Sequence, residues 1–285
     1  MSKLYSMHYF GKFDDAALVA PPIYEGHSQG YTEAPLINRT TGSVHTGLSM
    51  SELSPGGAVS PHVHSYEEGF YVLAGRAAVA VNGRLYQLRP GDFGVLKVGT
   101  PHAWCNEASE PVRWLQMASP QPKPAGEPRD TFFMKDVSIP SDAAPLLGHF
   151  DVGEIPQSDD GRITAGGLKG VFLEWMIDEK LGARHHRMLF IEYQPGVSIG
   201  LHDHTFEEAY FILSGEVQAT LDGRTYRAAA GDVLWTGVGC VHAFANVSNA
   251  PVRWLETFAP QPPAENVFRF VAEWEQRAKE LEGQP

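Results

Sequence analysis

The chain has 285 residues, of which 43% are hydrophobic and 20% charged, a composition typical of a globular protein with enough apolar material for two modest cores. Its formal net charge of -12 disfavours nucleic acid and anionic membranes as partners, so we expect a small molecule instead. No apolar run resembles a signal peptide, and no segment approaches the ~18 apolar residues that cross a bilayer. These features predict a cytoplasmic protein.

One part of the sequence occurs twice. Residues 56–92 read GGAVSPHVHSYEEGFYVLAGRAAVAVNGRLYQLRPGD, and residues 196–232 read GVSIGLHDHTFEEAYFILSGEVQATLDGRTYRAAAGD. They align without a gap at a constant offset of 140 residues, and the match continues through a shared PVRWL. Such self-similarity indicates a duplicated domain. Because proline is concentrated near 121–150, we expect an N-terminal domain over 1–130 and a C-terminal domain over 131–285.

Each copy has the pattern of an all-β domain. Short β-branched and aromatic runs such as FYVLAG and YFILSG alternate with turn signals, among them the hairpin pairs Asn82-Gly83 and Asp222-Gly223. No helical periodicity interrupts either copy. Antiparallel strands avoid free edges by closing on themselves, so a small barrel or jelly roll is the expected form.

The pattern changes after residue 262. Apolar residues there recur at the spacing of a helix, which predicts an amphipathic helix that packs against a barrel. The residues of this predicted stripe are Val267, Phe270, Val271, Trp274, Ala278 and Leu281.

Each copy also carries three histidines and a glutamate that a barrel can bring to one point. Side chains two residues apart on a strand share a face, so each His-x-His pair can present two imidazoles to one ion. The glutamate keeps the same parity, and the third histidine comes from a distant strand. The predicted ligands are His62, His64, Glu68 and His102 in the first copy, and His202, His204, Glu208 and His242 in the second.

Three neutral imidazoles and one carboxylate suit a divalent transition metal. Iron(II) or manganese(II) is the first expectation, with nickel, cobalt and zinc left open, and an octahedral ion would keep two positions for chemistry. We expect two ions per chain.

Several other polar residues are placed away from the ligands. Glu67 and Glu207 have the opposite parity, so we expect them to face solvent, although either could replace its neighbour as a ligand if the strand bulges. The matched His45 and His185 are expected to be structural or to line a pocket. No partner is indicated for the remaining histidines, which are expected on the surface: His8, His27, His149 and His186. Cys105 and Cys240 form no Cys-x-x-Cys pair, which predicts small buried apolar residues.

Two sequence patterns resemble the motifs of the cupin superfamily. They are G-x5-H-x-H-x3-E-x6-G, from 56 to 75 and from 196 to 215, and G-D-x6-G-x2-H-x3-N, from 91 to 106 and from 231 to 246. The resemblance implies a bicupin: two tandem jelly-roll barrels in which the eight residues above bind metal. Lys97 and Gly237 replace a proline often seen in the second motif, which affects a turn and not the ligands.

A divalent ion with one glutamate keeps a net positive charge inside a dry barrel, and this favours a chelating, oxygen-rich anion as substrate. Four aromatic residues share the parity of the ligands and form a tentative pocket wall, although plain core packing explains them equally well. They are Phe70, Trp104, Tyr210 and Phe244.

The leading functional hypothesis is a dioxygenase, because the chain is similar to bicupins of the quercetin dioxygenase type, which use three histidines and a glutamate. An enzyme similar to manganese oxalate decarboxylase is the alternative, and non-catalytic binding of a metal or small molecule is the third. The substrate, the native metal, the general acid or base, the equivalence of the two sites and association into a homo-oligomer stay open.

The two complete ligand sets predict close to two divalent ions per chain, measurable by elemental analysis of protein purified without chelator. Because the folded chain binds the metal and the unfolded chain hardly does, chelation should lower the melting temperature. Trace metal only, after growth in supplemented medium, would contradict the assignment.

Overall fold

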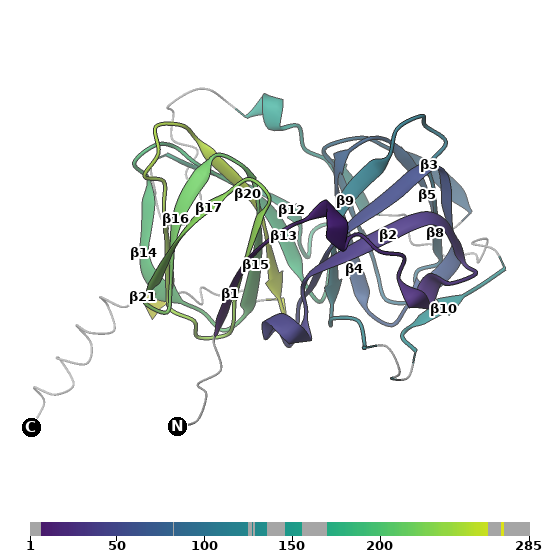
Figure 1. Cartoon of the computed structure of the whole chain (residues 1–285), viewed down its shortest axis with the longest axis horizontal. Coiled ribbons are helices and arrows are strands. Elements are labelled where there is room, and N and C mark those ends of the chain that lie inside the picture. The colour runs from purple at the N-terminus through teal and green to yellow at the C-terminus, as the bar shows by residue number, and fades with distance from the viewer. Residues whose placement is uncertain are drawn as a thin grey trace, which may run out of the picture.

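The computed structural model of the chain describes residues 7–81, 83–124, 127, 129–135, 146–155, 170–261 and 269–270. Two β-barrels lie side by side, and short 3₁₀ turns connect some of the strands (Figure 1). The all-β prediction and the two tandem barrels are therefore confirmed. Within the described residues, no helix is long and apolar enough to cross a membrane.

The first barrel is built on one sheet with the order β11-β7-β4-β9-β3-β8-β5-β6, in which β2 and β10 also pair with β3. Its strands are β2 (Ser28–Ile37), β3 (Gly47–His64), β4 (Glu67–Ala74), β5 (Ala77–Val81), β6 (Arg84–Leu88), β7 (Asp92–Leu96), β8 (His102–Cys105), β9 (Val112–Ser119), β10 (Thr131–Phe133) and β11 (Leu146–His149).

The second barrel combines a sheet of order β1-β18-β15-β20-β13-β12 with one of order β17-β16-β19-β14-β21. Its strands are β1 (His8–Lys12), β12 (Val171–Ile177), β13 (Arg187–Tyr193), β14 (Ser198–Asp203), β15 (Glu207–Ser214), β16 (Glu216–Leu221), β17 (Arg224–Ala229), β18 (Asp232–Thr236), β19 (His242–Ala245), β20 (Val252–Ala259) and β21 (Arg269–Phe270). The 3₁₀ turns are η1 (Asp15–Ala17), η2 (Pro22–Tyr24), η3 (Arg39–Thr41) and η4 (Val152–Glu154).

Strand pairing crosses the expected division at residue 130 in both directions. The N-terminal strand β1 pairs with β18 of the second barrel, from His8 opposite Thr236 to Lys12 opposite Asp232. In Figure 1 this strand lies among the strands of the second barrel. Conversely, β10 and β11 follow residue 130 but pair with β3 and β7 of the first barrel. The division at 130 stays a prediction, and each barrel uses strands from both sides of it.

The predicted C-terminal helix lies almost entirely outside the described residues. Its one described stripe residue, Phe270, is not helical: Arg269 and Phe270 form β21 and pair with Asp203 and His202 of β14. An edge strand leaves backbone N–H and C=O groups unpaired, and this short strand pairs with the last two residues of β14.

The predicted hairpin turn at Asp222-Gly223 is confirmed, since both residues have positive φ, of 47° and 77°. Its counterpart Asn82 lies outside the described residues. The asparagines that end both motifs are structural. Asn106 is 1% exposed and donates from Nδ2 to the carbonyls of Leu53 and Glu110, both at 2.9 Å, and Asn246 bonds in the same way.

Three apolar cores follow from the alternation of side chains along the strands. In β4, Phe70 and Val72 point into the first barrel, whereas Tyr71 joins a core made by both barrels. In β15, Tyr210 points into the second barrel, whereas Phe211 joins the same shared core. Both faces of these two strands are therefore buried, one inside a barrel and one between the barrels.

The expectation that Glu67 and Glu207 face solvent is wrong, because the opposite face of each strand meets the other barrel. Glu67 is 1% exposed, and its carboxylate accepts hydrogen bonds from the backbone N–H groups of Arg184 and His185, at 2.8 and 3.0 Å. Its Oε1 also lies 2.9 Å from Nδ1 of His186. Burial would raise the pKa of Glu67, but the hydrogen bonds and charge of His186 and the amides lower it overall.

Glu207 makes the reciprocal contact and is 2% exposed. It accepts from the backbone N–H groups of Val44, His45 and Thr46 at 2.8, 3.1 and 3.2 Å, and from the hydroxyl of Ser43 at 2.6 Å. Two buried carboxylates thus lock each barrel to a loop of the other. We call Glu67, Glu207 and these loop partners the interdomain clamp.

Several histidines lie in or next to the interdomain clamp. The matched His45 and His185 are half-buried and exposed, respectively, and bind the clamp carboxylates through their backbones. His186 is fully buried rather than on the surface. His27 and His149 are exposed as expected, but neither lacks a partner: His27 stacks on Phe133 with ring centroids 3.7 Å apart, and Nδ1 of His149 lies 2.6 Å from Oδ1 of Asp92.

Glu207→Gln should lower the free energy of unfolding by about 3 kcal/mol. The amide oxygen cannot accept all of these hydrogen bonds, and the amide NH2 group would point at backbone N–H groups that are themselves donors. Denaturant unfolding followed by circular dichroism measures this change. Glu107→Gln, which alters an exposed carboxylate, is the control and should stay within about 0.5 kcal/mol of the parent. Equal stability of the two variants would contradict the clamp.

Candidate metal centres

The structure brings the predicted histidines together in both barrels. The candidate ligand atoms of His62, His64 and His102 all lie within 4.8 Å of one another, and the same is true of their second-barrel counterparts. His62 of β3 lies opposite His102 of β8, and a register shift in β3 after Val59 precedes this pair. The pair His202 and His242 repeats this arrangement across β14 and β19.

The glutamates complete both groups. Oε2 of Glu68 lies 3.1 Å from Nε2 of His64 and 3.9 Å from Nε2 of His102. Oε2 of Glu208 lies 2.8 Å from Nε2 of His204 and 3.2 Å from Nε2 of His242. All eight side chains are nearly inaccessible, with exposed fractions between 1 and 5%.

Hydrogen bonds fix the orientation of the imidazole rings. Nδ1 of His62 lies 2.7 Å from the carbonyl of Ser60, and Nδ1 of His102 lies 2.9 Å from that of Thr100. A carbonyl oxygen only accepts, so Nδ1 carries the hydrogen and the lone pair of Nε2 faces the centre of the group. Carbonyls likewise accept from Nδ1 of His202, His204 and His242.

The donor set of the first barrel fits a divalent cation. Nε2 of His64 and Nε2 of His102 are buried and make no hydrogen bond to any described residue. They face the carboxylate of Glu68, an arrangement of electron-rich atoms that a bound cation, or a proton on Glu68, would stabilise. Nitrogen and oxygen donors of this kind suit first-row divalent metals, so the residues present fit the expected metal.

In the second barrel burial acts to lower the pKa of His204, but the charge and hydrogen bond of Glu208 raise it overall. In the first barrel burial keeps the histidines neutral, as a metal ligand requires. It lowers the pKa of His62 to about 4, with His64 adding to the effect, and that of His64 to about 3. It raises the pKa of Glu68 to about 7. At Glu208 burial also acts upward, but the charges and hydrogen bonds of His204 and His242 hold the pKa well below its usual value.

The surroundings of the two groups differ. The hydroxyl of Tyr210 donates to the carboxylate of Glu208, whereas the matching position in the first barrel is Phe70. Behind it, Trp254 Nε1 donates to Glu256 at 2.8 Å, whereas Trp114 in the first barrel donates to the neutral Gln116 at 3.3 Å. Burial, with the charge of Glu208, raises the pKa of Glu256 well above its usual value.

The four aromatic residues suggested as a pocket wall are packed inside the barrel cores, with exposed fractions from 0 to 4%. Trp104 stacks on Trp114 with ring centroids 4.7 Å apart, and Phe244 stacks on Trp254 at 5.7 Å. Phe70 and Tyr210 contact these aromatic pairs from the side. Contact with a substrate stays a prediction for all four.

Sequence reasoning missed several neighbours of the histidines. Tyr66 stacks on His64 at 4.3 Å, and Phe206 stacks on His204 at 4.0 Å. Tyr66 and Phe206 occupy matching positions in the two copies, and this match could have indicated a shared role beside the histidines. Tyr24 lies 5.6 Å from His62 between ring centroids, and Thr131 Oγ1 lies 3.0 Å from His64 Nδ1. Both lie outside the repeat, and no pattern marked them.

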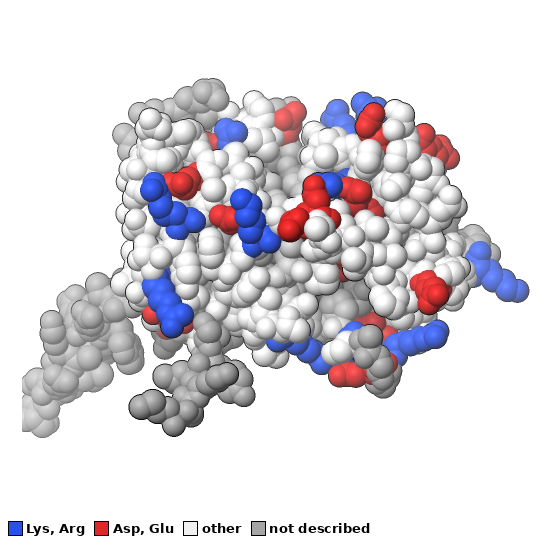
Figure 2. Space-filling view, viewed as in Figure 1, with Lys and Arg blue, Asp and Glu red and all other residues white. Residues whose placement is uncertain are grey.

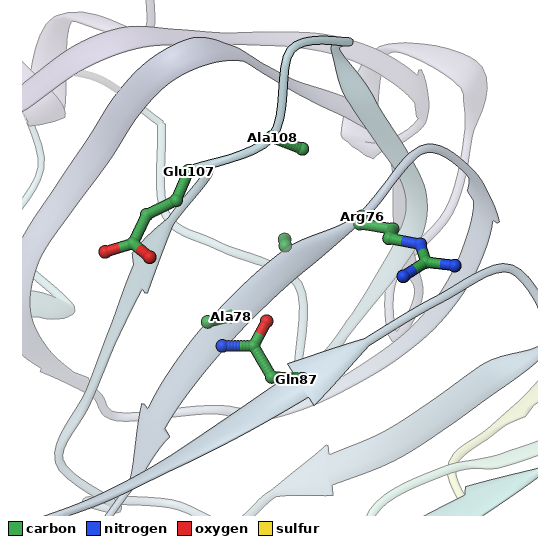
Figure 3. Close-up of a pocket in the computed structure, with 6 residues that line it drawn as sticks. Arg76, Ala78, Gln87, Glu107 and Ala108 are labelled. Carbon is green, nitrogen blue, oxygen red and sulfur yellow. The ribbon is translucent and has the colours of Figure 1, made fainter.

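A surface depression on the first barrel lies away from these ligands. Figure 3 shows it between β5, β6 and the loop after β8, lined by Arg76, Gln87, Glu107 and three alanines. None of the eight predicted ligands lines it. On the face shown in Figure 2, acidic and basic side chains of the described residues are interspersed over both barrels and form no extended basic patch.

Comparison with known proteins identifies the family. The cupin domain model matches residues 49–117 and 189–258. The tetracenomycin polyketide synthase protein TcmJ of Streptomyces glaucescens is 30% identical over 132 residues, which cover 46% of this chain and 85% of that protein. The chain therefore belongs to the cupin superfamily, with two tandem cupin domains.

Other relatives match shorter stretches. The oxalate-binding protein of Thermotoga maritima is 40% identical over 62 residues, 21% of this chain and 51% of that protein. The transcriptional regulator PuuR of Escherichia coli is 34% identical over 74 residues, 26% of this chain. The match spans only 40% of the length of PuuR.

Solved structures share the two-barrel fold over almost the whole chain. The oxalate decarboxylase of Lactobacillus farciminis, in a formate complex, superposes with a TM-score of 0.65 at 19% identity and covers 97% of this chain and 94% of its own. A putative glyoxylate-induced protein of Pseudomonas aeruginosa gives 0.68 at 15% identity, with 92% and 91% covered. At these identities the likeness establishes the fold.

His62→Ala and His202→Ala should each remove about one metal ion per chain and leave the fold intact, because each alters a polar group of the ligand set and not the apolar core. Elemental analysis and circular dichroism measure the two effects. His27→Ala, at an exposed histidine, is the control and should retain both ions. Unchanged metal content in either ligand variant would exclude that histidine as a ligand.

Proposed function

We propose that this bicupin is a metal-dependent enzyme that cleaves a carbon–carbon bond of a small, oxygen-rich anion of the oxalate class. The observation that carries the proposal is the pair of buried groups of three histidines and one glutamate. A divalent ion bound there would act as a Lewis acid toward carboxylate oxygens. Iron(II) and manganese(II) are the ions we expect.

The burial of the ligands supports a small substrate. With all eight side chains at most 5% exposed, a bulky molecule could not approach them without rearrangement of the barrel. One carboxylate ligand leaves a divalent ion with net positive charge, which favours an anion. The oxalate-binding relative and the oxalate decarboxylase neighbours favour a dicarboxylate.

For oxalate itself the proposed reaction balances without a co-substrate. The hydrogen oxalate anion, HC2O4⁻, loses CO2, and its proton ends on carbon to give formate, HCO2⁻. The protein must then exclude bulk water and move one proton. In the first barrel Tyr24 is 6% exposed and its ring lies 5.6 Å from that of His62, so we propose that it helps to exclude water from this site.

An oxygen-dependent cleavage is the second candidate, and it retains the dioxygenase hypothesis. A set of three histidines and one glutamate leaves room for both a chelating anion and O₂ on an octahedral ion. Similarity to a polyketide synthase protein favours β-diketones or catechols as substrates for this reaction.

We further propose that one barrel carries most of the activity. The predicted ligands match between the barrels, but Phe70 and Gln116 of the first barrel are replaced by Tyr210 and Glu256 at the matching positions of the second. Because the polar groups beside the two ligand sets differ, the two barrels would stabilise the transition state of the same reaction to different degrees.

Turnover should be measured with iron- and manganese-loaded protein against oxalate, β-diketones, catechols and flavonols, in air and under nitrogen. We expect formate and CO2 from oxalate without net oxygen consumption. Oxygen uptake with a β-diketone, catechol or flavonol and no oxalate turnover would instead support the second candidate. No turnover of any substrate by protein with full metal content would contradict both and favour non-catalytic binding.

His62→Ala and His202→Ala should reduce this turnover unequally, one by more than tenfold and the other by less than threefold. The two variants serve as controls for each other, since each leaves one complete ligand set. Equal losses would defeat the proposed division between the barrels.

A further inference from the structure

A third group of metal-binding side chains lies where the N-terminal strand meets the second barrel. It consists of His8, Asp222 and Cys240, whose candidate ligand atoms all lie within 4.8 Å of one another. None of them belongs to the predicted cupin ligand sets. The expectation that His8 is a partnerless surface residue is therefore wrong: it is 7% exposed and bonded to the second barrel.

Three separate segments bring these residues together. His8 begins β1 and lies opposite Thr236 of β18. Asp222 occupies the hairpin turn between β16 and β17, and Cys240 lies in the loop between β18 and β19. The two loops are joined by a bond from Asp222 N to Val241 O at 2.8 Å, and Val241 N donates to Oδ1 of Asp222 at 3.2 Å. This second bond leaves Oδ2 directed at His8, 3.1 Å from its Nδ1.

The imidazole of His8 is also oriented from its far side. Nε2 lies 2.9 Å from the hydroxyl of Tyr226, whose ring packs edge-on against it. Both hydrogen bonds of His8 depend on its tautomer; in the tautomer that donates from Nε2 to Tyr226, the lone pair of Nδ1 is free to bind a metal beside Asp222. A hydrogen bond at one ring nitrogen that directs the other is how proteins orient a metal-binding histidine.

The burial of the group suits a structural ion. His8 and Cys240 are 7% and 1% exposed, whereas the side chain of Asp222 is 34% exposed. Two donors are thus enclosed and the third borders solvent, which gives an entry path and a side for a fourth ligand from water. Thiolate, imidazole and carboxylate together are a donor set that zinc(II) prefers in tetrahedral sites.

We propose that His8, Asp222 and Cys240 form a zinc site that fastens the N-terminal strand to the second barrel. The site shares no side chain with the cupin ligand sets, and Cys240 touches them only through its backbone carbonyl, which accepts from Nδ1 of His242. It is also particular to the second barrel, since the positions matching Asp222 and Cys240 in the first are Asn82 and Thr100.

Cobalt(II) tests the site directly, because a thiolate bound to cobalt gives a charge-transfer band in the near ultraviolet and the cupin ligand sets contain no sulfur. Titration of metal-free protein with cobalt(II) should produce this band, and zinc(II) should bleach it. Cys240→Ser should reduce the band at least tenfold. Cys105→Ser, which removes the only other thiol, should leave it unchanged.

Two further variants separate this site from the cupin sites and from a folding defect. The double variant His62→Ala/His202→Ala should keep the thiolate band even where its cupin metals are lost. His8→Gln lies on a terminal strand and should lose the band while circular dichroism shows both barrels folded. Absence of the band in the parent protein, or its persistence in Cys240→Ser, would overturn the proposal.

The melting temperature gives a second readout. Zinc(II) added to metal-free protein should raise it more in the double cupin variant than in the same variant that also carries Cys240→Ser, because an ion bound only by the folded state stabilises that state. An equal rise would contradict a structural site at Cys240.

Discussion

The alternation of side chains along β4 and β15 is the constraint on which the rest of the structure depends. In each strand two adjacent glutamates point in opposite directions. Glu68 and Glu208 face the histidines inside their barrels, and Glu67 and Glu207 face the other barrel. The strand that supplies a predicted ligand is therefore the strand that fastens the domains, and neither contact can shift by one residue without exchanging the two faces.

This arrangement shows how the two copies of the duplicated domain hold each other together. Both copies keep the ligand pattern and the clamp, so the two halves bind each other by the same device used in reciprocal directions. The polar groups behind the ligands have changed, since Tyr210 and Glu256 of the second barrel occupy the positions of Phe70 and Gln116 in the first. Conserved geometry with altered electrostatics is the basis for the unequal roles proposed for the barrels.

The fold and the grouping of the predicted ligands could be read from the sequence because they depend on short-range parity and on the repeat. Parity fixed which glutamate shares a face with the histidines, but it could not tell what covers the opposite face, and so Glu67 and Glu207 were assigned to solvent. His8 was missed because Asp222 lies 214 positions away. The helical spacing around Phe270 failed locally because a free edge of β14 was available to pair with it.

Anomalous diffraction from crystals of manganese- or iron-loaded protein tests the central claim most directly. We predict two peaks per chain at the absorption edge of the metal, each about 2.0–2.3 Å from the Nε2 atoms of three histidines and an oxygen of Glu68 or Glu208. A fully loaded crystal with no peak inside either barrel would contradict the account.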